Sequence, residues 1–169
     1  MSQPTATENS RDFRAALGSF ATGVTVLTTL ATDSRPIGVT ISSFNSVSLD
    51  PPLILWSLSL NSPNIEAFQN ADHYSVNVLA AGQQDISNRF ASPRNDRFAD
   101  IATRQGLSGI PLIEGCCAWF ECSNEAHYPG GDHLIFVGRV ERFSLGLAES
   151  PLIFHNARYR QLDDSRASD

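Results

Sequence analysis

Two segments rich in small hydroxyl side chains carry the residue types best suited to hold a polar ligand. They run from Thr40 to Ser46 and from Ser57 to Pro63. Alternate residues of a regular strand share a face, so Thr40 and Ser42 would present hydroxyls on one side while Ile41 faces the core. The pattern predicts a binding wall, although serine and threonine are also common in strands and helix caps, and both interpretations stay open.

The second segment ends in a pattern typical of a helix start. Ser62 is a suitable N-cap, and Pro63 suits the first helical position, with Ile65 and Phe68 following on one face. The free N–H groups and the positive dipole end of such a helix favour a phosphate.

An ionisable pair lies on a glycine-rich turn, in Gly130-Gly131-Asp132-His133. A turn at a strand start can present a side chain to a ligand, so His133 is the candidate catalytic residue. Asp132 could orient the imidazole or merely cap the turn, and a histidine in a turn is often only a surface residue. A Ser-His-Asp hydrolase is less favoured, because the chain has no GxSxG motif.

Several classes of function are excluded by what the chain lacks. All 12 basic residues are arginines, so no lysine is available for a Schiff base or a P-loop. Neither GxGxxG nor GxxxxGKS occurs. The net charge of −6 opposes binding to nucleic acid. Apolar runs fall short of the roughly 20 residues that cross a bilayer, and the polar N-terminal stretch does not resemble a signal peptide. We therefore expect a cytoplasmic protein without nucleic-acid or membrane partners.

Three cysteines, Cys116, Cys117 and Cys122, lie close together in the chain. An odd number in so short a stretch favours reduced thiols over a disulfide framework. His127 is near enough in sequence to suggest zinc, but no CxxC pair is present, and adjacent cysteines on a strand point to opposite faces. We expect no metal site.

The elements that must position these residues are mostly strands. Apolar spacing after Ser10 predicts an amphipathic helix that packs one face inward and ends at Gly23. Another short helix is expected over 83–90, and an irregular stretch over 92–115 is a candidate lid or subunit contact. The expected strands cover residues 24–30, 37–47, 53–58, 74–79, 118–126 and 133–143. Six strands with few helices between them indicate an antiparallel barrel.

Six blocks of residues extend along the chain from Phe13 to Leu162. The blocks are Phe13–Arg14 with Phe20–Val26, Ser46–Pro52, Val76–Leu79, Phe90–Ala91, Gly131–His133 with Phe136–Val140, and Pro151–Phe154. In their order and spacing they resemble the short-chain flavin reductase family.

The resemblance implies a mainly β fold, a six-stranded antiparallel split β-barrel (a Greek-key, FMN-binding split barrel) with a few short flanking helices. It implies a homodimer that binds FMN or FAD at its interface and reduces it with NADH or NADPH (class EC 1.5.1). Such reductases supply reduced flavin to the oxygenase of a two-component monooxygenase. The residues that match the family's flavin site are Thr40, Ile41, Ser42, Ser43, Phe44, Ser46 and Val47, with Asn61 and Ser62 at the phosphate and His133 on the nicotinamide side.

The domain is expected over residues 10–162, with disordered tails at 1–9 and 163–169. Some members of the family carry a lysine near the phosphate, which this chain cannot match, so the choice between FMN and FAD stays open. Two alternatives to the reductase also remain: a flavin-binding carrier or sensor without NAD(P)H turnover, and a structural barrel without a ligand.

Overall fold

The computed structural model describes residues 10–93, 96–148 and 150–162. The predicted tails, 1–9 and 163–169, lie outside the described residues. No helix of the described part is long and apolar enough to cross a membrane. The helices are α1 (Ser10–Gly18), α2 (Ile65–Asn70) and α3 (Gln84–Ala91), with short 3₁₀ turns at Ala81–Gln83 and Leu107–Gly109.

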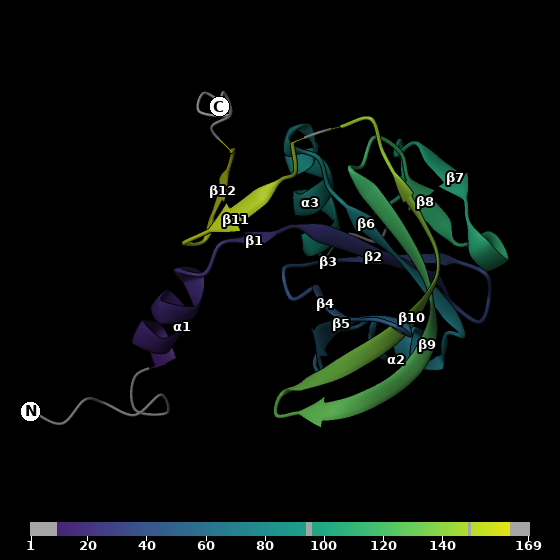
Figure 1. The fold of residues 1–169 in the computed structure, drawn as a ribbon, viewed down its shortest axis with the longest axis horizontal. Helices are drawn as coiled ribbons and strands as arrows, with labels where there is room; N and C mark the ends of the chain where they lie inside the picture. Colours follow the sequence, from purple (N-terminus) through teal and green to yellow (C-terminus); the bar gives the residue numbers. More distant parts are fainter. Residues whose placement is uncertain (1–9, 94–95, 149, 163–169) are drawn as a thin grey trace, which may run out of the picture.

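The fold is mainly β, as predicted, and is built on one strongly curled antiparallel sheet (Figure 1). The strands are β1 (Thr22–Gly23), β2 (Thr25–Leu30), β3 (Pro36–Ile41), β4 (Asn45–Leu49), β5 (Pro52–Ser59), β6 (His73–Val78), β7 (Thr103–Gln105), β8 (Pro111–Ile113), β9 (Ala118–Gly130), β10 (His133–Leu145), β11 (Ile153–His155) and β12 (Arg158–Arg160). The main sheet has the order β3-β2-β6-β9-β10-β5-β4.

The expected number of six strands is therefore wrong, because the sheet has seven. The segment predicted as one strand over 37–47 forms two, β3 and β4, separated by Ser42–Phe44. These consecutive strands occupy the two opposite edges of the sheet and do not pair with each other. Strand pairing therefore does not close the described sheet into a barrel.

Two hydrophobic clusters fill the two faces of β2, which is buried on both sides. Leu27 points into the first cluster, where Trp56 stacks on Phe136 with ring centroids 4.1 Å apart. Val26 points into the second, together with Phe90 of α3. Since every second side chain of a strand faces the same way, the run of apolar and β-branched residues in β2 supports both cores.

The N-terminal helix differs from its prediction in two respects. It ends at Gly18 instead of continuing to Gly23, because Ser19 and Phe20 close the last turn through backbone hydrogen bonds to Ala16 and Leu17. Its apolar face is not packed inward: α1 stands away from the main sheet (Figure 1), and Leu17 on this face is 59% exposed. Among the described elements, the small sheet β1-β11-β12 lies beside it.

The stretch 92–115, predicted to be irregular, contains the small hairpin of β7 and β8 in its described part. Arg104 of β7 lies over the ring of Trp119, with its guanidinium carbon 4.8 Å from the ring centroid. The pairing of β7 with β8 could not be predicted, because this stretch contains glycine and proline residues, which are typical of loops.

Candidate functional site

A hollow of about 290 Å³ opens where three strand ends meet. The end of β3 forms one side, and β5 with the start of β10 forms the other, because Ser59 pairs with His133 in antiparallel register. The hollow brings His133 together with the first hydroxyl segment. Its lining residues are Thr40, Ile41, Ser42, Ser43, Ser57, Leu58, Ser59 and His133.

The hydroxyl groups of Thr40, Ser42 and Ser43, which form one wall of the hollow, differ in their hydrogen bonds. Ser43 Oγ accepts a hydrogen bond from Ser57 N at 3.0 Å and donates to Ser57 O at 3.1 Å, which ties the segment after β3 to β5. Thr40 Oγ1 donates to Ser87 O of α3 at 2.7 Å. The Ser42 side chain is exposed and has no hydrogen bond to any described residue. Ser42 is therefore the hydroxyl of this segment that is free for a ligand.

The remaining predicted flavin residues lie outside the hollow. Phe44 packs on the first core cluster, with its ring centroid 5.6 Å from that of Phe120. Ser46 and Val47 lie on β4, where a bulge shifts the pairing with β5. The sequence segment predicted as one wall is thus divided, because the chain turns away after Ser43 to reach the other edge of the sheet.

Asn61 and Ser62 form the turn that follows β5, directly beyond Ser59 of the hollow. Ser62 does not cap a helix, as its sequence context suggested. Its hydroxyl accepts from Asn64 N at 3.3 Å, a local turn that delays the start of α2 to Ile65 and makes Asn64 the N-cap residue. The predicted phosphate residues therefore lie on a turn beside the hollow, not in its lining.

His133 follows a two-residue turn at the tip of the β9–β10 hairpin. Gly131 adopts a positive φ of 71°, which such a turn favours for glycine. His133 Nδ1 lies 2.7 Å from Asp132 Oδ1, and this hydrogen bond lowers the pKa of Asp132 below its ordinary value. The Asp132 carboxylate orients the imidazole and leaves Nε2 as the ring nitrogen available to a ligand.

The described residues contain no group of three or more histidine, cysteine or acidic side chains that could hold a metal ion. The three cysteines are free thiols, and burial raises the pKa of Cys116 and of Cys122 to about 12. A buried neutral thiol is inert compared with a reactive thiolate.

A second, larger cavity was not predicted from the sequence. It has a volume of about 1160 Å³ and lies between the β2–β3 turn, α2 and the residues around Arg97 and Phe98. These parts are far apart in the chain, and no local motif marks the place where they meet.

Comparison with known proteins identifies the family and the fold. Residues 17–163 match the family described as flavin reductase like domain. This chain belongs to that family. The predicted resemblance is thereby confirmed over most of the domain.

Members of the family include close relatives of this chain. It is 46% identical over 144 residues to the reductase component of flavin-dependent trigonelline monooxygenase from Acinetobacter baylyi, covering 85% of this chain and 46% of that protein. It is 50% identical over 136 residues to the FMN reductase (NADH) SmoA of Agrobacterium fabrum, covering 80% and 76%. The chain spans about half the length of several curated relatives that it matches.

A solved member of the family has nearly the same fold. The NADH:FAD oxidoreductase SgcE6 of Streptomyces globisporus, in complex with NAD and FAD fragments, superposes with a TM-score of 0.90 at 33% identity. The match covers 98% of this chain and 99% of that one.

The described residues fit a polar part of a flavin through the exposed, unpartnered hydroxyl of Ser42. Ile41 and Leu58 also line the hollow, but their side chains belong to the first hydrophobic cluster, so the hollow is bounded there by the strand ends that carry them.

Proposed function

We propose that this chain is an NAD(P)H-dependent flavin reductase of class EC 1.5.1 that reduces FMN or FAD. The observation that carries the proposal is the hollow that joins the hydroxyl wall of Thr40–Ser43 to His133. Membership of the flavin reductase like family supports it. So do relatives named as an NADH-dependent FMN reductase and as a monooxygenase reductase component.

A flavin and a reduced nicotinamide bring the redox chemistry with them when both are bound. The chain has to align two rings and exclude competing reactions, which needs shape more than strong acids or bases. The strand ends that carry Ile41 and Leu58 would bound the flavin, and the Ser42 hydroxyl would form a hydrogen bond with a polar edge or chain of the flavin. His133, held by Asp132, would position the nicotinamide side.

In the decisive experiment, the purified chain is mixed under anaerobic conditions with NADH and with free FMN or FAD in large molar excess over the protein. A reductase bleaches the flavin absorbance over many turnovers. A carrier or sensor of the same fold binds flavin without bleaching it, and a structural barrel binds none. Testing both nicotinamides against FMN, FAD and riboflavin then gives the specificity for each substrate.

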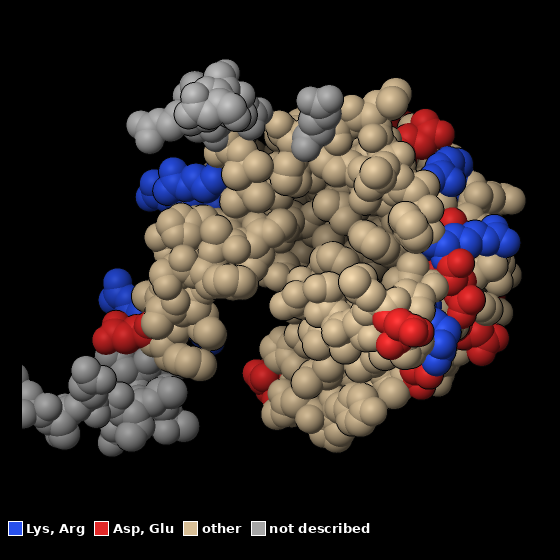
Figure 2. All heavy atoms as spheres, in the orientation of Figure 1, with Lys and Arg blue, Asp and Glu red and all other residues tan. Residues whose placement is uncertain are grey.

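We further propose that the chain acts as a homodimer. Figure 2 shows that the face between α1 and the β9–β10 hairpin is deeply notched and carries few charged side chains. Large apolar side chains are exposed on α1 (Phe13, Leu17), beyond it (Phe20), and on the last part of β10 (Phe143, Leu145). Exposed apolar side chains are typical of surfaces that bind another protein chain.

Light scattering at micromolar concentration measures this directly. A homodimer gives twice the chain mass of 18.4 kDa, whereas the chain mass itself would contradict the proposal. Phe20→Ser, which removes an exposed ring without touching the hollow, should shift the mass toward the monomer.

The reduced flavin would pass by diffusion to a separate oxygenase, as the names of several relatives suggest. Contact between the reductase and the oxygenase need only be transient. The free thiols of the described cysteines are compatible with the reducing conditions of the cytoplasm.

A further inference from the structure

The hairpin of β11 and β12 is joined to α3 by the hydroxyl group of one tyrosine. Tyr159 Oη lies 2.8 Å from Ser87 Oγ and donates to Asn88 Oδ1 at 3.0 Å. A phenol has a single proton, and Asn88 takes it, so Ser87 must donate its own proton to the phenol oxygen. The Ser87 side chain is fully buried. The Tyr159 hydroxyl is therefore the partner of a buried hydroxyl on α3, which would be costly to leave unpaired.

α3 in turn lies directly against β3, the strand that ends in the hollow. Thr40 Oγ1 donates to Ser87 O at 2.7 Å. The helix can come this close because Gly38 has no side chain, whereas a Cβ there would overlap the ring of Phe90. Ser87 therefore contacts the hairpin through its hydroxyl and the wall of the hollow through its carbonyl.

The bond to α3 determines what the Thr40 hydroxyl can offer to a ligand. This hydroxyl has one proton, which is directed to Ser87 O, so its oxygen can only accept a further hydrogen bond. The unpartnered hydroxyl of Ser42, in contrast, can donate or accept. Thr40 therefore suits a donor on the ligand, and a flavin has two kinds, the ring N–H and the hydroxyls of the ribityl chain.

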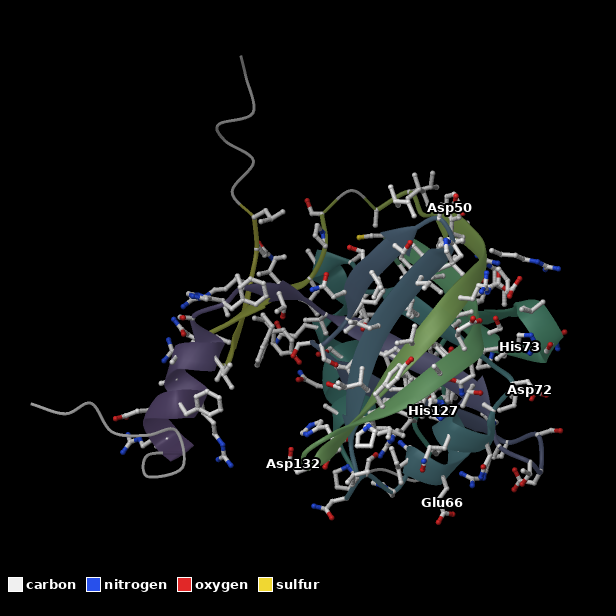
Figure 3. All side chains as sticks on the ribbon, turned by 60° about the horizontal axis from the view of Figure 1, so that its bottom comes forward. Asp50, Glu66, Asp72, His73, His127 and Asp132 are labelled. Carbon is white, nitrogen blue, oxygen red and sulfur yellow. The ribbon has the colours of Figure 1, made fainter. Side chains whose placement is uncertain are left out.

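Tyr159 is not among the described residues that line the hollow. It lies on the small sheet, opposite Phe154 of β11, with the two ring centroids 5.4 Å apart. Figure 3 shows the yellow strands of this sheet apart from Asp132, which marks the tip of the β9–β10 hairpin next to the hollow. An effect of Tyr159 on a bound flavin would therefore have to pass through α3.

Building on the proposed reductase function, we propose that Tyr159 is a positioning residue for the flavin site. Its hydroxyl fixes α3 through Ser87, and α3 holds Thr40 so that the threonine oxygen accepts from an N–H or O–H of the flavin. The hairpin of β11 and β12 thereby sets the affinity for flavin without touching it.

The main test compares Tyr159→Phe with the parent. The variant loses only the hydroxyl and keeps the ring that packs against Phe154. Fluorescence titration should show about three- to tenfold weaker binding of FMN, the loss expected for one neutral hydrogen bond. Steady-state kinetics should show a KM for FMN that is higher by the same factor, with kcat within about twofold of the parent.

Lumiflavin, which has the ring but no ribityl chain, identifies the donor. A similar loss of lumiflavin binding in Tyr159→Phe supports the proposal with the ring N–H as the donor. A loss for FMN alone supports it with a ribityl hydroxyl as the donor.

Thr29→Val is the matched control for a general loss of stability. Thr29 is buried, and its Oγ1 donates to His73 O at 2.8 Å. Neither residue is among those that line the hollow or join it to the small sheet. Thr29→Val should therefore lose stability in urea, as Tyr159→Phe does, and bind FMN within about twofold of the parent.

A double-mutant cycle tests whether the effect passes through Thr40. Thr40→Val removes the bond to α3 and nearly keeps the shape of the side chain. In that background, Tyr159→Phe should weaken FMN binding by less than about twofold. Should Tyr159→Phe fail to fold, Ser87→Ala removes the same bond from the side of the helix and should give the same loss of affinity.

Three results would overturn the proposal. These are an unchanged FMN affinity in Tyr159→Phe, an equal loss of affinity in Thr29→Val, and an undiminished effect of Tyr159→Phe in the Thr40→Val background. In each case the parent still bleaches flavin with NADH, so the reductase function stands. A parent that binds no flavin would instead remove the proposed function, and the positioning role with it.

Discussion

Ser43 and Ser57 are 14 residues apart in the chain and exchange two hydrogen bonds through a single hydroxyl group. Ser57 N donates to Ser43 Oγ, and Ser43 Oγ donates to Ser57 O. This contact joins the segment that leaves β3 to β5, two strands of one sheet that do not pair directly with each other. The residues around the hollow thus also help to hold the two sides of the sheet together.

Ser43→Ala should lower both stability and flavin affinity. It leaves Ser57 N and O without their partner, which should reduce the free energy of unfolding by about 1–2 kcal/mol. Ser42→Ala is the matched control, because the Ser42 hydroxyl has no bond to lose among the described residues. It should keep the stability of the parent and weaken flavin binding only. Urea unfolding and flavin titration of both variants measure the two effects, and equal stability losses would contradict the assignment.

His133→Ala should lower kcat/KM for the nicotinamide by about 10- to 100-fold, or about 1.4–2.7 kcal/mol, with little change in flavin affinity. The reason is lost alignment, not a lost proton. The hydrogen bond with His133 lowers the pKa of Asp132, so the carboxylate stays ionised at neutral pH and keeps the ring oriented.

Stopped-flow flavin reduction at several pH values is the appropriate measurement for His133. A loss nearer 10⁴-fold that follows one titration would indicate acid–base catalysis instead of positioning. A variant as fast as the parent at limiting nicotinamide would exclude His133 from the site.

The strands that could be predicted are those whose pattern is local. Alternation and β-branched residues indicated β2, β5 and β6, and the turn glycines indicated the β9–β10 hairpin. The break after Ile41 could not be predicted, because Ser42-Ser43-Phe44 contains neither glycine nor proline. The exposed face of α1 has the same spacing that a buried face would have.

For the site, sequence reasoning found the residues that a contiguous segment supplies. Thr40 to Ser43 lie together in the hollow because they are neighbours in the chain, and Ser59 and His133 join them through strand pairing. The larger cavity depends on Arg97 reaching Gly38 across 59 positions of the chain. Such a contact depends on the tertiary fold, and the spacing of residues in the sequence does not predict it.

His127 should make the stability of the protein depend on pH. Burial lowers the pKa of His127 below its ordinary value of 6.5, and its Nε2 lies 2.9 Å from Asn124 Oδ1. A depressed pKa means that the native state favours the neutral ring. The contribution of the neutral His127 ring to the stability of the protein is therefore complete above about pH 6.5. It is lost as the pH falls below that value and through the lower pKa of His127 in the native state.

His127→Gln keeps an amide donor for Asn124 and cannot titrate. Unfolding in urea at pH 7.5 and at pH 5.5 should show a larger decrease in stability for the parent than for this variant. The same decrease in both proteins would show that other groups cause the pH dependence.

Gly138→Ala should destabilise the protein through a clash in the first core cluster. A Cβ at Gly138 would overlap the Tyr74 hydroxyl, which is buried and has no partner among the described residues. Overpacking of this kind typically costs about 1–3 kcal/mol. Tyr74→Phe removes the obstructing oxygen, so the double variant should recover part of the loss in urea unfolding.

Gly23→Ala controls for the general effect of replacing a glycine in a strand, because an added Cβ there meets nothing within 4 Å. It should stay within about 0.5 kcal/mol of the parent. A loss as large as that of Gly138→Ala would argue against the clash.

The outer edge of β3 has a consequence for aggregation. An exposed edge strand offers unpaired backbone groups to another chain and can template intermolecular sheets. Here Gly38 O is already engaged, by Arg97 Nη1 at 2.8 Å and Asn64 Nδ2 at 3.4 Å. Side chains that line the larger cavity therefore also shield an edge of the sheet from strand addition, so replacing them should increase the tendency of the protein to aggregate in concentrated solution.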